Sequence, residues 1–357
     1  MANFNLNITD LITEFGAYYE DRGQGEKDIR SQLFKTDDFS ELFTLQPTDN
    51  DIYRTTYQTA SSVLQGFVKR FTSKGGGAME PWSQLLGHFK IDMKVAPDDY
   101  AESFIGFLAN LKEVDRSQWP MIAYIIRTII LPKAKEENFT DVNYWGWKFT
   151  GEVASSPTVN GTSFVRQLTT AIIDAGVPPN SSADGIHTII ARMHAAGRLG
   201  AEVAMGAIPS DEEDFCSYVE TMFADSSIHT ELRKKIDYAM MSTELYKKYR
   251  EGRRLKYNLA YRAEVNLDEI KDTNIMVRGS DAMFGSNQIW ATPAFNRKLV
   301  RKSNNLGKFD VQKLDREVKL LSDWKENLAL DYPEFVVVND QDLTISAGLI
   351  TTYYTPV

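Results

Sequence analysis

The run from Trp119 to Pro132, WPMIAYIIRTIILP, limits most strongly how this chain folds. Its apolar side chains recur at three- and four-residue spacing and also fill part of the opposite helical face. A helix that is apolar over most of its circumference is buried from more than one side. The run is shorter than the ~20 residues that cross a bilayer. We therefore expect a central helix laid across a sheet.

The flanks of this run predict where the helix begins and ends. Ser117 is a suitable N-cap, and Pro120 fits the first turn, where its missing N–H costs nothing. Pro132 is expected to end or kink the helix, because proline removes a backbone donor. The polar stretch from Lys133 to Glu137 continues towards solvent. The prediction is a long, kinked helix over residues 118–137.

Composition narrows the class of protein. The chain has 357 residues, 43% of them hydrophobic, and a net charge of −9. The length suggests two or three domains, and the acidic balance argues against a globally basic nucleic-acid binder. The first thirty residues lack a basic and apolar signal segment, so we expect an intracellular origin. The only cysteine, Cys216, leaves no intrachain disulfide, and its amphipathic surroundings predict a buried structural thiol.

The first hundred residues contain segments that cannot bury enough surface alone. Residues 1–50 carry only short apolar stripes, which are too small to offset the ordering entropy of the chain. The alternatives are a frayed terminus or an arm that lies on something else. In residues 51–100, alternation over 63–67 and over 89–95 flanks three consecutive glycines. This pattern predicts an extended two-stranded hairpin with a loose tip, and such a hairpin usually rests on a neighbour.

The rest of the chain reads as helices followed by strands and turns. A loop is expected over 150–161. Helices are expected over 164–175, 185–197, 210–224 and 230–249. Strands are expected over 288–293, 335–338 and 343–348.

A search for catalytic or ligand-binding motifs predicts none. Gly75, Gly76 and Gly77 do not form a phosphate-binding loop, because no Lys-Ser/Thr pair follows at the required spacing. His187 and His194 can share a helix face near Asp184, but a metal site needs a further ligand and supporting groups. We therefore predict a non-enzymatic protein without cofactor or metal.

The region from Arg233 to Arg262 is basic and rich in tyrosine. Basic side chains with stacking aromatics are typical of single-strand nucleic-acid binding. The same composition is typical of subunit contacts, which we favour. The pairs Arg297-Lys298 and Arg301-Lys302 carry the same ambiguity. The ten cations are Arg233, Lys234, Lys235, Lys247, Lys248, Arg250, Arg253, Arg254, Lys256 and Arg262.

The order of these elements resembles a known family. An arm, an extended hairpin, one long helix, a helical middle and a β-rich return are similar to the tailed-bacteriophage major capsid proteins. Their shared fold is of the Hong Kong 97 type, also used by encapsulin shells. The segments that carry the resemblance are Ser117–Glu137, Trp145-Gly146, Ser280–Asn296, Lys308–Lys319 and Pro333–Val338. It covers residue 100 to the end, whereas residues 1–99 match only by position and character.

The resemblance implies an α+β architecture with four parts. These are an N-terminal arm (1–50), an extended β-hairpin loop (51–100), a peripheral domain (101–161 and 285–357) that contains the spine helix 118–137, and an axial domain (162–284). Family members place a strand that ends in glycine near the position of Trp145-Gly146.

The resemblance also implies a function. The chain would be a structural subunit of an icosahedral virion shell, made in the bacterial cytoplasm and built from hexamers and pentamers. Its partners would be further copies of itself, scaffolding and portal proteins, and packaged double-stranded DNA held non-specifically, with no membrane. The alternatives are an encapsulin-like nanocompartment shell and, from another class, a nucleic-acid-binding protein using residues 233–262. The expected assembly contacts are Gly75, Gly76, Gly77, Trp82, Arg250, Arg253, Arg254 and Tyr257.

Overall fold

The structure is a computed structural model, and eleven stretches of it are described. They are residues 40–60, 62, 64–67, 69–96, 124–148, 158–159, 162–163, 182–257, 266–303, 310–314 and 317–343. Several predicted features lie outside these stretches. They are the arm up to residue 39, the start of the central helix at Ser117 and Pro120, the helix 164–175 and the last strand after Leu343. Tyr261 and Arg262 also lie outside them.

An elongated mixed sheet forms one half of the molecule. Its strands are β1 (Thr44–Thr48), β11 (Arg297–Lys302), β13 (Glu317–Leu330), β12 (Asp310–Leu314) and β4 (Gly87–Val95). The order is β1-β11-β13-β12, and β4 also pairs with β13. Strand β13 pairs with β12 over residues 317–321, with β11 over residues 326–330, and with β4 over residues 318–326. It is therefore the strand that joins the other strands of this sheet.

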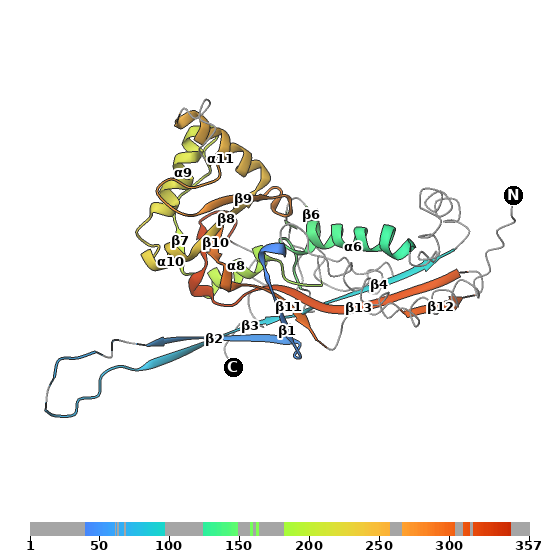
Figure 1. Ribbon diagram of the computed structural model, residues 1–357, viewed down its shortest axis with the longest axis horizontal. Coiled ribbons are helices and arrows are strands. Elements are labelled where there is room, and N and C mark those ends of the chain that lie inside the picture. Colours follow the sequence, from blue (N-terminus) through green and yellow to red (C-terminus); the bar gives the residue numbers. More distant parts are fainter. Residues whose placement is uncertain are drawn as a thin grey trace, which may run out of the picture.

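A two-stranded ribbon extends away from the sheet (Figure 1). Strands β2 (Ile52–Ala60) and β3 (Gly77–Leu85) are antiparallel, with Ile52 opposite Leu85. Only Leu86 separates β3 from β4, so the chain passes from pairing with β2 to pairing with β13. Nine residues of antiparallel strand span about 30 Å. The ribbon is thus a long projection that continues directly into the main sheet.

The hairpin was predicted from alternation over 63–67 and 89–95, but other segments form it. Residues 64–67 form no strand, and residues 89–95 do lie in a strand, but it pairs with β13. Alternation indicates a strand with one buried face, but it does not indicate which other strand pairs with it. In β4, Phe89 and Val95 are buried on one face, whereas His88 and Lys90 are exposed on the other.

The central helix runs from Tyr124 to Val142 in the described residues. It comprises a π-helical turn Ile126–Ile130, α6 (Leu131–Glu137) and a second π-helical turn Asn138–Val142. As the predicted range 118–137 requires, it continues through Pro132, and it ends at Val142 rather than at Glu137. In the first π turn the N–H of Leu131 bonds to the carbonyl of Ile126, five residues back. This wider turn changes the hydrogen-bond register just before the proline, where an α-helix would lose a bond.

The helix lies along the elongated sheet, as Figure 1 shows. Val142 packs with Phe89 of β4 and Trp324 of β13. Tyr124, Ile125 and Ile126 are buried as well. The prediction of a buried central helix across a sheet is therefore confirmed for the described part. None of the helices among the described residues has the length and apolar character to cross a membrane.

A second, more compact part combines a five-stranded sheet with helices. Its strand order is β7-β14-β10-β8-β9. The strands are β7 (Ala201–Val203), β14 (Val337–Asn339), β10 (Trp290–Pro293), β8 (Ile236–Ser242) and β9 (Met276–Ser280). The helices are α8 (Ile186–Ala195), α9 (Glu212–Ala224), α10 (Thr230–Lys235) and α11 (Thr243–Lys256).

Short elements complete the described chain. The 3₁₀ turns are η1 (Ser40–Leu42), η6 (Asp281–Met283), η7 (Ala294–Asn296) and η8 (Pro333–Phe335). The two-residue strands β5 (Thr158–Val159) and β6 (Thr162–Ser163) pair with each other, β5 within the expected loop 150–161 and β6 just after it.

Several local predictions are confirmed, and others are corrected. Helices α8 and α9 and strands β10 and β14 lie where expected, although Asp211 rather than Ser210 caps α9. The helix expected over 230–249 is interrupted by β8, whose residues Ala239, Met240 and Met241 are buried in the sheet. Ser242 then caps α11 by accepting from the N–H of Leu245.

Two further observations concern the expected parts of the family fold, whose domain bounds stay a prediction. Strands β10 and β14, from the range 285–357, lie in the sheet of β7, β8 and β9, so the C-terminal range supplies strands to both sheets. Trp145-Gly146 lies at the turn that follows the central helix, rather than at the end of a strand. A Cβ at Gly146 would lie 2.3 Å from the carbonyl oxygen of Val142, so the close approach there requires glycine.

Candidate assembly interface

The root of the ribbon is joined to the body by hydrogen bonds from both strands. The hydroxyl of Tyr53 donates to a carboxylate oxygen of Asp331 at 2.9 Å. The hydroxyl of Thr55 donates to the backbone carbonyl of the same aspartate at 2.5 Å. From β3, the amide of Gln84 donates to the carbonyl of Leu330 at 2.8 Å. These bonds fix the ribbon's inner face onto the end of β13.

Arg198 provides a second set of contacts at the root. Its guanidinium donates to Glu334 at 2.5 Å and to the carbonyl of Pro81 in β3 at 2.8 Å. It also lies over the ring of Trp82, 5.6 Å from the centroid. A cation over an indole face is favourable, more so where water is excluded. Arg198 thus links the body of the protein to β3.

Aromatic rings cover the same junction. Tyr57 of β2 packs edge-on against Phe335 at 5.5 Å and against Tyr332 at 6.0 Å between ring centroids. Phe295 packs against Phe335 in the same way. Apolar and polar contacts together therefore hold the near half of the ribbon in one direction.

Asp51 forms a charged clamp where the chain enters the ribbon. Its carboxylate accepts from Lys302 at 2.6 Å and from Lys325 at 3.0 Å. Hydrogen bonds from these two lysines lower the pKa of Asp51 to about 2. The carboxylate is exposed, so its contribution to stability is screened by solvent and salt.

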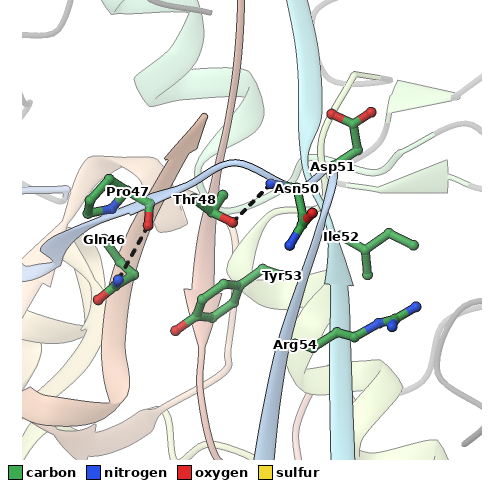
Figure 2. Close-up of a pocket in the computed structure, with 8 residues that line it drawn as sticks. All are labelled: Gln46, Pro47, Thr48, Asn50, Asp51, Ile52, Tyr53 and Arg54. Carbon is green, nitrogen blue, oxygen red and sulfur yellow. Dashed lines mark hydrogen bonds between the residues drawn. The ribbon is translucent and has the colours of Figure 1, made fainter. Parts of the chain in front are cut away.

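A pocket of about 520 Å³ lies beside this entry. Figure 2 shows its lining residues, with Tyr53 pointing to one side of β2 and Ile52 and Arg54 to the other. Most polar lining groups are already bonded within the chain: Tyr53 to Asp331, and Asp51 to its two lysines. The pocket therefore offers no converging set of catalytic groups.

The ribbon tip, defined as residues 64–67 and 69–76, is the most apolar exposed part of the described surface. Leu64 is 85% exposed, and Phe67 and Phe71 are each 92% exposed. Met79, just behind the tip, is 70% exposed. Nearly all of each side chain faces water, an unusual state for a large apolar group gathered with others. Gly75 and Gly76 of this tip were among the predicted contacts, but its apolar side chains were not, although its phenylalanines interrupt a polar, glycine-rich segment.

The tip has a defined shape despite its exposure. The amide of Gln65 donates to the carbonyl of Thr72 at 2.8 Å, and Lys74 donates to the carbonyl of Leu64 at 2.5 Å. Gly75 has a φ of 94°, a left-handed backbone that favours glycine. Gly76 has open space around it and Gly77 begins β3. The three predicted glycines thus return the chain into the ribbon.

In the part of the chain that the structure describes, four of the ten cations in the basic, tyrosine-rich region pair with carboxylates of the same chain, among them Lys234 with Glu231. Arg250 pairs with Asp268, Arg254 with Glu251, and Lys256 with Glu220. Tyr257 donates to the carboxylate of Glu220 at 2.8 Å. Cations that already have carboxylate partners attract phosphates weakly. The ion pairs therefore do not favour nucleic-acid binding by this region.

The other basic pairs have similar intramolecular roles. Arg297 is buried and pairs with Asp237 at 2.5 Å. Arg301 pairs with Glu326 at 3.1 Å, and Lys302 belongs to the Asp51 clamp.

The predicted contact residues fall into two groups. Trp82 and Arg253 are only 3% and 8% exposed, so they belong to the core of the chain rather than to its surface. Arg253 donates to the hydroxyl of Tyr249 at 3.1 Å. Arg250 and Arg254 are exposed on α11, and Tyr257 is half-buried. These three residues remain predicted contacts, as do Gly75, Gly76 and Gly77.

The remaining chemical candidates have structural partners. His187 lies 2.9 Å from the carbonyl of Asp342, and His194 lies 2.9 Å from the carboxylate of Glu202. Asp184 pairs with buried Arg192 at 3.1 Å. No cluster of three or more metal-ligating side chains occurs among the residues that the structure describes. Cys216 is buried, as predicted, and burial raises the pKa of its thiol to about 12.

Comparison with known proteins gives structural likenesses only. No model of a protein family matches the sequence, and no curated protein matches it. The solved structures similar to the chain include viral capsids and an encapsulin.

Three of these structures illustrate the range of the likeness. A chain of the satellite phage P4 procapsid has 10% identity and a TM-score of 0.48, over 93% of this chain and 97% of that one. A chain of the native GTA particle capsid has 9% identity and a TM-score of 0.49, over 84% and 88%. The holo-SrpI encapsulin complex of Synechococcus elongatus has 12% identity and a TM-score of 0.42, over 89% and 90%.

Proposed function

We propose that this chain is the major subunit of an icosahedral shell of the Hong Kong 97 type. In this proposal, copies assemble into hexamers and pentamers and enclose double-stranded phage DNA. The observation that carries the proposal is the ribbon, whose root is locked to the body and whose apolar tip lies in solvent. A rigid ribbon with an exposed apolar tip is suited to contact another molecule.

The energetics favour association through the tip. Full burial of a Leu, Met or Phe side chain contributes about 1.5–3 kcal/mol. The tip presents Leu64, Phe67 and Phe71 almost completely to water. A contact made by the tip of one copy on a different surface of the next is heterologous, and such contacts close into rings when the rotation permits. Repeated rings then build a shell.

The test is assembly of the purified chain, followed by negative-stain electron microscopy and light scattering. We expect wild-type protein to form closed particles, sheets or rings. The double variant Phe67→Ser/Phe71→Ser is expected to remain folded, because these side chains pack against little, and to assemble poorly. The matched control is Phe67→Leu/Phe71→Leu, which retains the apolar character and is expected to assemble.

Two results contradict this proposal. One is a wild-type chain that remains monomeric or dimeric at high concentration and after addition of salt or crowding agent. The other is a serine variant that assembles as well as the leucine control. The contents of particles from their natural source then distinguish the two kinds of shell. Nuclease-resistant double-stranded DNA supports a virion, and enclosed protein cargo indicates a nanocompartment.

A further inference from the structure

The ribbon tip combines apolar and positively charged side chains. Leu64, Phe67 and Phe71 are almost fully exposed. Between and beside them lie three exposed cations, whereas the whole chain carries a net charge of −9. The surface that receives the tip should therefore present an apolar group beside negative charge. The three cations are Lys69, Arg70 and Lys74.

The tip cannot pack on the body of its own chain in this conformation. Contacts at Tyr53, Thr55 and Gln84 fix the direction of the ribbon. The strands then carry the tip away from both sheets (Figure 1). A receiving surface must consequently belong to another molecule.

A surface with the required chemistry lies on the turn after β9. Phe284 follows η6 and is 60% exposed, the highest value for a large apolar side chain outside the ribbon among the described residues. Asp281, whose carbonyl accepts from the N–H of Phe284 at 3.1 Å, is exposed. Asp342 is exposed as well, and its carboxylate accepts from the N–H of Asn287 at 2.7 Å. We call Asp281, Phe284 and Asp342 the Phe284 patch.

The Phe284 patch rests on a firm base. The two residues before Phe284, Ala282 and Met283, are buried in the core, and η6 packs against the end of the central helix. Ser280 caps η6 by accepting from the N–H of Ala282. Contacts within the chain thus hold the patch in place, so docking onto it requires little ordering.

We propose that the ribbon tip of one copy packs on the Phe284 patch of a second copy. This inference rests on the proposed function and names the surface that the tip contacts. Phe67 and Phe71 supply the apolar contact to Phe284, and Arg70 and its neighbouring lysines face Asp281 and Asp342. Opposite charges around an apolar centre favour this pairing over self-association of two cationic tips.

Cysteine cross-linking in assembled particles tests the contact. One preparation of the full chain carries Phe71→Cys, another carries Phe284→Cys, and the two are assembled together under mild oxidation. We expect a disulfide-linked dimer on a non-reducing gel, absent from each preparation alone. The native Cys216 is buried and present in all samples. The matched control replaces Phe284→Cys by Phe295→Cys, a phenylalanine that is 43% exposed at the ribbon root.

Exchanging the charges on the two surfaces gives a second test of the same contact. Arg70→Asp and Asp281→Arg are each expected to raise the concentration needed for assembly several-fold, and the double variant is expected to restore it. Assembly without cross-linking at Phe284, or cross-linking equal to that at Phe295, overturns this inference and leaves the shell proposal standing. Single variants that are not rescued by the exchange also overturn it. Failure of wild-type protein to assemble overturns both.

Discussion

His187 is a buried titratable group within a network of side chains and backbone. It lies on α8 beside the rings of Tyr144 and Trp145, and its Nε2 is 2.9 Å from the carbonyl of Asp342. A carbonyl only accepts, so Nε2 carries the proton of the neutral ring. Burial lowers the pKa of His187. The imidazolium is disfavoured because it loses solvation.

This environment predicts a pH-dependent stability. The unfolded histidine takes up a proton below about pH 6.5, whereas folded His187 resists protonation. Its contribution to the free energy of unfolding is therefore present above about pH 6.5 and lost as pH falls below it. Urea unfolding of the unassembled chain at pH 7.5 and 5.5 measures the change.

The variant His187→Gln is expected to show a smaller pH dependence over this interval. The matched control is His88→Gln, since His88 is exposed and pairs with Asp323 at 3.4 Å. An equal pH dependence in wild type and His187→Gln would show that other groups determine the acid sensitivity.

At the scale of elements, the ribbon depends on the strand it approaches. Its inner face meets residues 330–335, which belong to the end of β13 and to η8. Asp331 is buried, and desolvation raises the pKa of its carboxyl group, while the hydrogen bond from Tyr53 opposes that shift. A buried carboxylate that loses its donor is costly. The Tyr53–Asp331 bond should therefore hold the ribbon to the body.

The substitution Tyr53→Phe removes this donor and keeps the ring. We expect a loss of about 1–3 kcal/mol in the free energy that holds the root closed. Amide hydrogen exchange is expected to accelerate in β2 and β3 and to remain unchanged in α9 and α11. The control Arg54→Ala alters the exposed face of the same strand. Unchanged exchange in β2 and β3 would mean that Arg198 and the aromatic contacts suffice.

At the scale of the whole molecule, the free subunit combines well-packed parts with one exposed projection. The helices α9 and α11 pack around Phe215, Cys216 and Tyr249, which are fully buried. The ribbon tip, by contrast, exposes three large apolar groups and three cations to solvent. The tip should therefore be far more accessible to a protease than the packed helices are. Assembly should reduce this difference by covering the tip.

Limited trypsin digestion measures this change. In the unassembled chain we expect early cleavage after Lys69, Arg70 or Lys74, because each is exposed in the tip. In assembled particles the same sites are expected to be protected at least tenfold, because a neighbouring copy covers them. Exposed Lys133 and Lys234, which lie on other elements, provide internal references. Equal tip cleavage in both states would contradict burial of the tip on assembly.

Patterns that depend on neighbouring residues were predictable from the sequence. The apolar circumference of 119–132 indicated a buried helix, and the acidic start after Pro209 indicated α9. The alternation from Phe89 to Val95 indicated a strand, now β4. In each case the signal is local, because period and capping are properties of adjacent residues. The two candidate contact groups, at the glycine-rich turn and on α11, were found by composition.

Only the tertiary structure decided which elements meet. It assigned β4 to β13 and β3 to β2, and it made a strand of Ile236–Ser242 within a predicted helix. It placed Trp82 inside and Phe71 outside, although both are aromatic residues of the same segment. Pairing and burial depend on contacts between residues far apart in sequence. Local periodicity does not encode those contacts, because any half-buried strand shows the same alternation.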